Sequence, residues 1–443
     1  MKTRQFLFSV LSSVVALAMA FAFQSCSSDK VADAGDILST VPSDVSLVAV
    51  INSGSMLEKT DCKVADGKIT PSKKISEAVA KIQNPQAKNF LTAFINGQSG
   101  IDPSVMVLFK EGYNTYLTGV AADPESLEKT LKENGYEDFS ATDGIKISQN
   151  AAIAGNRFWV NVNSGSIDLG DVRHFNTLDK TQSFLQNSYA DELCQVTSDI
   201  SGWGNIAGLL NTGVMSFENR AYFQIALQTV FEDPSSFIFN INSEKGAFVS
   251  QFSVINSKGK NAKFQLPADK VDIATIKSLG GNADLLAAFS IPKKLIDNLR
   301  KDTKSKAPSV FDIYLQQLGS IDGTIALCAG ANDGVKGIIT TTGRDTSGLS
   351  SLLTSLGFSV VLDGKMMQIS KGTPTGSLDV AETANDFKGA VAGIYTNHFG
   401  NKAEAEFLKS LSVMLNSEGG GIVVKIKAAT LDSKENALLS IMK

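Results

Sequence analysis

Short apolar runs, arranged in pairs around glycine turns, recur along this 443-residue chain. One pair begins at residues 105–109 and turns at Glu111-Gly112, and another begins at residues 324–328 and turns at 332–334. Strands joined by such short turns pair in antiparallel fashion. Helical segments that end at a glycine lie between the pairs. The pattern predicts an α+β fold with a mainly antiparallel sheet and helices packed on one face.

The same order of elements occurs twice. In each half, a short helical pattern ends at a glycine and an Asp-Gly turn leads into a strand, at residues 126–148 and again at 348–370. Upstream, the apolar run 45–52 leads into a helical start, as the run 284–290 does in the second half. We therefore expect a duplicated module, with related α+β halves at about residues 41–270 and 275–443.

A second unit recurs less clearly. Residues 224–227 lead to the apolar run 237–241, a turn and the closing strand 247–252. Near the end of the chain, residues 407–415 lead in the same way to the run 421–426. There the closing strand is expected to be missing, with residues 436–439 in its place.

The beginning of the chain has the layout of a secretory signal. Lys2 and Arg4 precede residues 6–23, which carry no charge, and Ser25 then precedes Cys26. A small residue directly before cysteine resembles the lipobox of bacterial lipoproteins, although Phe23 stands where that motif usually has an aliphatic residue. A plain signal peptide and an uncleaved anchor helix are the alternatives.

The lipobox resemblance implies that residues 1–25 are a signal peptide and that Cys26 carries the lipid, as the sole membrane contact. Residues 26–40 would then be a flexible tether, because they are acidic and hold little apolar mass. Ser27, in place of an aspartate, favours the outer membrane by the known sorting rule. The side of that membrane, periplasmic or outer, stays open.

The opening of the body carries a family resemblance. Residues 41–52 combine a Pro-small-acidic turn, an apolar strand and Asn52. This opening resembles that of a Bacteroidales lipoprotein family defined as a domain of unknown function. The resemblance implies a cell-envelope lipoprotein with no assigned activity.

Charge and cysteine usage narrow the picture further. Removal of Lys2 and Arg4 with the signal changes the formal charge from −4 to −6, and no basic cluster occurs, so nucleic acid is not an expected partner. Cys328 lies in an apolar run and is expected to be a buried thiol. Cys62 and Cys194 could form a disulfide or stay free.

No catalytic or metal-binding motif stands out. His174 and His398 are the two histidines, and both are expected in loops. The glycine-rich residues 330–337 are expected to form a hairpin turn, because strands flank them. Nothing selects a pair of carboxylates for hydrolysis. We expect no metal, no cofactor and no enzyme activity.

The two tryptophans are the weak candidates for ligand contact. Trp159 shares a polar strand face with Arg157 and Asn161, and Trp203 lies between two glycines. Each could stack on a ligand such as a sugar ring, or could be buried by packing.

Together these features predict a lipid-anchored cell-envelope protein with a non-enzymatic binding or scaffolding role, towards a protein or glycan partner. A periplasmic carrier of an apolar ligand is the first alternative, and a hydrolase without a recognisable motif is the second.

Overall fold

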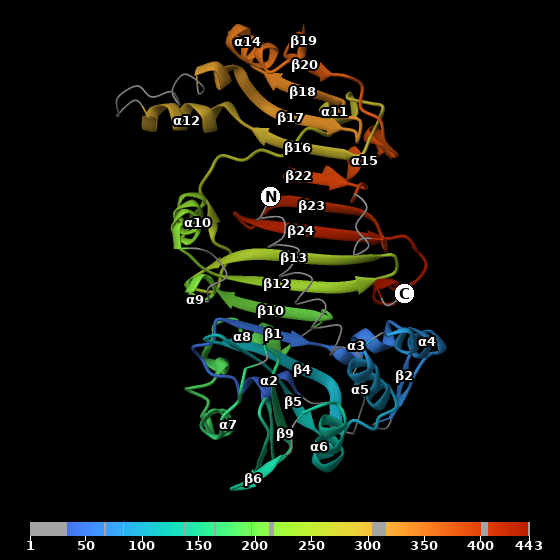
Figure 1. Ribbon diagram of the computed structural model, residues 1–443. Helices are drawn as coiled ribbons and strands as arrows, with labels where there is room; N and C mark the ends of the chain where they lie inside the picture. Colours follow the sequence, from blue (N-terminus) through green and yellow to red (C-terminus); the bar gives the residue numbers. More distant parts are fainter. Residues whose placement is uncertain are drawn as a thin grey trace.

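The computed structural model describes residues 33–65, 68–82, 84–136, 139–163, 165–195, 197–211, 217–303, 316–399 and 406–441. These residues form one antiparallel sheet of 18 strands. The sheet extends along the whole of an elongated molecule, from the first half at one end to the second half at the other (Figure 1). The expected α+β class and antiparallel sheet are confirmed.

The strands of the first half include the two long hairpins that the apolar runs predict. They are β1 (Leu47–Ile51), β4 (Ile101–Glu111), β5 (Asn114–Ala121), β6 (Ser140–Thr142), β7 (Ile145–Ile147), β8 (Ala151–Ala154), β9 (Arg157–Asn161), β10 (Ile200–Asn205), β12 (Pro234–Glu244) and β13 (Ala247–Asn256).

The second half supplies the rest of the sheet. Its strands are β16 (Leu285–Ile291), β17 (Ile321–Ala329), β18 (Val335–Thr341), β19 (Ser359–Asp363), β20 (Met366–Lys371), β22 (Ala390–Thr396), β23 (Leu408–Glu418) and β24 (Gly421–Thr430). Three small two-stranded pairs lie outside the sheet, namely β2 (Lys63–Ala65) with β3 (Lys68–Thr70), β11 (Phe231–Glu232) with β14 (Lys263–Phe264), and β15 (Asn282–Ala283) with β21 (Leu378–Asp379).

The strand order is mirrored about the pairing of β13 with β24. Outward from that junction the first half runs β13, β12, β10, β1, β4, β5. The second half runs β24, β23, β22, β16, β17, β18. The two halves thus use the same strand order, while a common origin by duplication stays a prediction.

One part of the expected second half is wrong. Most of residues 407–415, which we matched to a segment preceding a strand, lies in the strand β23, and β24 is the closing strand that seemed to be missing. Residues 437–441 form the helix α16 (Ala437–Ile441). The alternation of serine with aliphatic residues in β23 is the signal that would have marked it as a strand.

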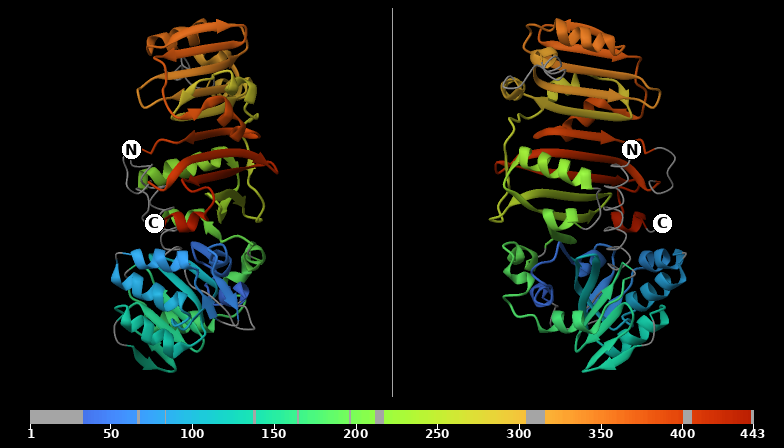
Figure 2. Two further views of the ribbon diagram at one scale, coloured as in Figure 1. Left: turned by 90° about the vertical axis from the view of Figure 1, so that its right-hand side faces the viewer. Right: turned by 60° about the vertical axis from the view of Figure 1, so that its left-hand side comes forward.

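Helices cover both faces of the sheet in each half, not one face as expected (Figure 2). In β1, residues Val48 to Ile51 are all buried, so both faces of the strand need cover. We call the two faces the α3 face and the α2 face, after a helix on each. The helices of the α3 face are α3 (Ser53–Glu58), α4 (Lys73–Lys81), α5 (Pro85–Ile95), α6 (Pro124–Glu133), α12 (Lys293–Thr303), η2 (Leu318–Ser320) and α14 (Ser347–Ser355).

The α2 face carries a second set. Its helices are α2 (Ala34–Leu38), α7 (Leu169–Thr177), η1 (Phe184–Gln186), α8 (Ala190–Cys194), α11 (Ile273–Lys277), α15 (Val380–Thr383) and η3 (Ala384–Phe387). Near the middle of the molecule lie α9 (Ile206–Asn211) and α10 (Phe217–Val230).

The expected tether is shorter than residues 26–40. Asp33 caps α2 by accepting a hydrogen bond from the Gly35 backbone, and Ile37 and Leu38 of that helix are fully buried against the sheet. The free energy gained by burying these two apolar side chains is enough to hold the segment on the sheet despite its acidic residues. Residues 33–40 therefore belong to the folded body.

The residues that carry the family resemblance have structural roles. After β1, the Asn52 side chain accepts a hydrogen bond from the Ser55 backbone and so caps α3. Nearby Asp199 is 1% exposed and pairs with Lys59 at 2.7 Å, while its other oxygen accepts two hydrogen bonds from Ser243 at 2.6 Å. Asp199 thereby joins α3 to β12 through the start of β10.

Candidate functional site

Both tryptophans lie in the core. Trp159 is 0% exposed and Trp203 is 6% exposed, in the apolar cluster of the α2 face. Phe175 packs against Trp159, and Phe184 packs edge-on against Trp203. Neither indole is open to a ligand. The two tryptophans are therefore packing residues of the core, and the prediction that they contact a ligand is wrong.

The three cysteines in the described ranges are free thiols. Cys62 lies in the core of the α3 face, whereas Cys194 lies against the core of the α2 face. The sheet separates them, which rules out the possible disulfide in this fold. Cys328 is 0% exposed, as expected. Cys26, the expected lipid site, lies outside the described residues.

The histidines and the glycine-rich segment offer no site. His174 is in the last turn of α7 rather than in a loop, and His398 follows β22 in irregular structure. Residues 330–334 join β17 to β18 as a hairpin, as predicted. Among the described residues, no group of three or more His, Cys, Asp or Glu side chains is placed to hold a metal ion.

One carboxyl group has a strongly shifted pKa. Burial at the end of β4, together with the charges of Asp44 and Asp171, raises the pKa of Glu111 to about 7. Asp171 also accepts a hydrogen bond from the Tyr116 hydroxyl at 3.3 Å. This cluster has a single carboxyl of raised pKa and no nucleophile placed beside it by a hydrogen bond, so its geometry gives no acid–base pair for hydrolysis.

The strands at the middle of the molecule are amphipathic. In β24, Ile422, Val424 and Ile426 point to the α3 face, while Lys425 and Lys427 point to the opposite face. On β23, Val413 and Leu415 lie opposite Ile426 and Val424. On β13, Phe252 lies opposite Val424 and Phe248 opposite Ala428, while Ser250 lies opposite Ile426. The α3 face at the centre of the sheet is therefore largely apolar, whereas the opposite face mixes lysines with the buried Met414 and Val423.

This central apolar surface is partly open to solvent. Directly opposite pairing places Ala287, Ile394, Val413 and Ile426 in one row across four strands. Ile394 is 50% exposed, and the other three are half-buried. We call the row and its neighbours the central strip, which consists of Ala287, Ile394, Leu411, Val413, Ile426 and Ala428.

Burial along β23 is the reverse of the usual pattern. Ser410 and Ser412 are buried at 6% and 8% exposure, whereas Leu411 and Val413 on the α3 face are half-buried. A strand normally buries its aliphatic residues and exposes its serines. A row of neighbouring apolar residues that stays partly open to solvent is a candidate contact surface.

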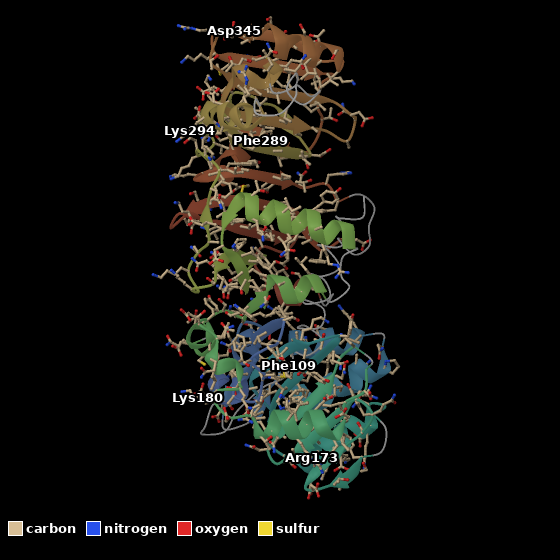
Figure 3. The ribbon with its side chains drawn as sticks, turned by 90° about the vertical axis from the view of Figure 1, so that its left-hand side faces the viewer. Phe109, Arg173, Lys180, Phe289, Lys294 and Asp345 are labelled. Carbon is tan, nitrogen blue, oxygen red and sulfur yellow. The ribbon has the colours of Figure 1, made fainter. Side chains whose placement is uncertain are left out.

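Helix α10 borders the central strip. Its Leu227 and Val230 pack with Leu415 and Val424, which lie two residues from strip members on β23 and β24. Figure 3 shows α10 in front of the sheet, between the labelled Phe289 and Phe109. Three apolar residues of the helix are exposed: Tyr222 at 74%, Phe223 at 42% and Ile225 at 60%.

The other borders of the strip are packed. Phe248 and Phe252 of β13 contact the core that contains Leu438 and Leu439 of α16. On the far side, Phe289 belongs to the core of the second half. The strip is thus an open band between two closed cores.

A small pocket borders α10, and none of its lining residues belongs to the strip. It has a volume of about 240 Å³ and is formed by α9, α10 and the start of β12, with Asn205, Gln224 and Gln228 among its lining residues. Small-molecule sites typically have about 300–1,000 Å³. The pocket is therefore small for an acyl chain, and its amide groups do not suit an apolar ligand.

The strip was not predicted from the sequence, because each apolar run was treated as a separate strand. The side chains on the two faces of neighbouring strands were not compared. The signal was present in residues 421–428 and 247–254, where apolar residues alternate with lysine, serine and glutamine. Recognition of the open face also needs the strand order, which pairs segments distant in the chain.

Comparison with known proteins adds little. No protein-family model and no curated protein matches the chain. Two solved structures, crystal forms I and III of TP0453, match the chain with a TM-score of 0.30 each. Form I is 10% identical and covers 80% of this chain and 97% of its own. Form III is 8% identical and covers 79% of this chain and 96% of its own. Likeness at this level supports no argument about fold or function.

None of the helices in the described ranges is both long and apolar enough to cross a bilayer.

Proposed function

We propose that this chain is a lipid-anchored protein of the cell envelope that acts by non-catalytic binding, with the central strip as its contact surface. Cys26 is the proposed lipid site, and the outer membrane is the proposed location. The reversed burial along β23 supports the binding role, because Leu411 and Val413 stay half-open while Ser410 and Ser412 are buried. The uncharged, aliphatic strip suits an apolar segment of a partner protein.

An apolar-ligand carrier is a weaker second candidate. The aliphatic chemistry of the strip favours it, since an acyl chain would find Ile394, Val413 and Ile426 in one row. However, the strip is open, and the pocket next to α10 holds only about 240 Å³ and includes no residue of the strip. A carrier normally encloses most of its ligand. The open geometry therefore favours a protein partner, whose own surface would shield the strip from water.

The anchor has a direct test. Cells grown with radioactive palmitate should label the wild-type protein and leave a Cys26→Ala variant unlabelled. The variant should also leave the membrane fraction, because attached acyl chains hold the protein at about 0.8 kcal/mol per buried methylene. Equal labelling of both proteins would remove the lipoprotein proposal and leave the strip proposal untouched.

The strip is tested by a photo-crosslinking amino acid placed at Ile394 in living cells. A discrete adduct is expected from this position and not from Lys427, an exposed residue of the opposite face. A Val413→Asp change in the same protein should abolish the adduct, since it puts a charge in the middle of the apolar row. Equal adducts from positions 394 and 427 would contradict the proposed contact surface.

A further inference from the structure

The two ends of the sheet differ in chemistry. One end is β6, whose Ser140, Ala141 and Thr142 are short and exposed and lead to the ion pair of Asp143 with Arg173. The other end is β19, which pairs only with β20 among the described residues. On β19, Val361 is 61% exposed and Leu362 is 46% exposed, and neighbouring Leu356 is 57% exposed.

An apolar edge of this kind is unusual for a protein that stays alone. A free edge strand presents unpaired N–H and C=O groups, and monomeric proteins protect such edges with charges, prolines or short strands. Strand β6 follows that rule with three residues, whereas β19 has five residues with neither proline nor lysine. The unprotected edge indicates that another strand pairs with it.

We propose that β19 pairs with β19 of a second copy of this chain, in antiparallel fashion about a two-fold axis at Val361. In this register Val361 lies opposite the partner's Val361, and Val360 lies opposite the partner's Leu362. Cross-strand pairs of aliphatic residues stabilise a sheet by about 0.2–1 kcal/mol each. The dimer joins two sheets into one continuous sheet and places both exposed apolar residues of β19 in contact.

Charge complementarity selects a second copy over an unrelated strand. The β19 strand ends at Asp363, and the Lys371 ammonium lies near its beginning, about 3.5 Å from a Cβ built on Gly357. An antiparallel pair puts the end of one strand against the beginning of the other. Asp363 of each copy therefore approaches the partner's Lys371. Lys365 lies across the hairpin against Gly343, away from this edge.

The chain already uses this geometry once. At the junction of its halves, β13 and β24 pair as antiparallel strands in corresponding positions of the two mirrored strand orders. The proposed β19 pairing is the intermolecular counterpart of that junction, at the opposite end of the second half. A closed two-fold pair also leaves no further apolar edge at this end, so the assembly stops at a dimer.

Single cysteines test both the dimer and its register. The full-length protein in detergent is oxidised with copper phenanthroline and run on a non-reducing gel. Val361→Cys should give a reducible dimer in high yield, because opposite Cα atoms lie about 4.5–5.5 Å apart, within disulfide range. Ser359→Cys alone should not, because its two copies lie about 13–14 Å apart along the strands. A mixture of Ser359→Cys and Asp363→Cys proteins should cross-link.

Two further measurements complete the test. The wild-type protein should have a dimer mass by light scattering at tens of micromolar, and Val361→Lys should have a monomer mass. The variant should melt at the temperature of wild-type protein diluted to its monomeric state, since the residue is exposed in the monomer. Ala141→Cys on the other edge, and the wild type with its native thiols, are the cross-linking controls. A monomeric wild type, a Val361→Cys yield no higher than that of Ala141→Cys, or equal yields at positions 359 and 361 would each overturn the proposal. Cross-linking to a different protein would do the same.

Discussion

Gly202 and Gly204 lie on either side of Trp203 in β10, and their role follows from the strand period. Trp203 points into the core of the α2 face, so both glycines point to the α3 face. There the rings of Phe239 and Phe237 cover them: a Cβ on Gly202 would lie 2.2 Å from Phe239, and one on Gly204 would lie 2.4 Å from Phe237. The glycines let aromatic rings lie flat across the strand.

Gly202→Ala should therefore destabilise the protein by about 1–3 kcal/mol, the usual cost of overpacking a core. Relief is difficult because the added methyl group would also lie 2.8 Å from the Val48 carbonyl oxygen. Urea unfolding measures the change. Gly54→Ala in α3 is the matched control, since its nearest contacts are at 3.7 Å. Equal stability of the two variants would contradict this role.

Glu111 makes the stability of the folded protein depend on pH. Its pKa is raised to about 7 in the folded state by burial and by Asp44 and Asp171, against about 4.3 in an unfolded chain. The folded state thus binds more protons between these values, so stability falls as the pH rises from about 4.5 to 7.

Glu111→Gln should raise stability by about 1–2 kcal/mol at pH 8, allowing for solvent screening, and should change it little at pH 4.5. Melting temperatures across this range measure the difference between variant and wild type. Glu58→Gln, an exposed change in α3, is the control. A Glu111→Gln gain that is the same at both pH values would show that removal of the charge is not the cause.

Among the elements, those marked by local signals could be predicted from sequence. The glycine-terminated helices correspond to α6 and α14, followed by Gly135 and Gly357 with φ of 90° and 86°. The Asp-Gly turns at 143–144 and 363–364 form hairpins. Two elements were missed for different reasons. Helix α2 is too short to show helical periodicity. The alternation that marks β23 as a strand was present in the sequence but was overlooked, because the segment was matched to one that precedes a strand.

Helix α2 supports a prediction about where the folded body begins. A chain that starts at Asp33 should match the full-length protein in stability, whereas one that starts at Val41 should lose several kcal/mol. The loss comes from Ile37 and Leu38, both 0% exposed, at about 1.5–3 kcal/mol each. Urea midpoints of the two truncated chains give the comparison. Equal midpoints would show that residues 33–40 are a tether after all.

At the scale of the whole molecule, the two halves are more closely joined than their separate ranges suggest. The junction pairs β13 with β24 from Ala247–Ala429 to Ser253–Val423. Beyond it, α16 at the end of the second half inserts Leu438 and Leu439 into the first core, and the Asn436 amide donates to the Ser243 carbonyl at 3.2 Å. These long-range contacts could not be read from the linear order of elements.

The first half alone, residues 33–270, should therefore fail to behave as an independent domain. It would lose the β24 partner of β13 and the two buried leucines of α16, each of which contributes about 1.5–3 kcal/mol. Its newly exposed β13 edge carries Phe248, Val249 and Phe252 and would favour aggregation. Size-exclusion chromatography should show aggregates, and co-expression with residues 271–443 should restore a soluble complex. A monomeric first half that melts at the temperature of the full chain would mean that the junction only connects two domains, each stable by itself.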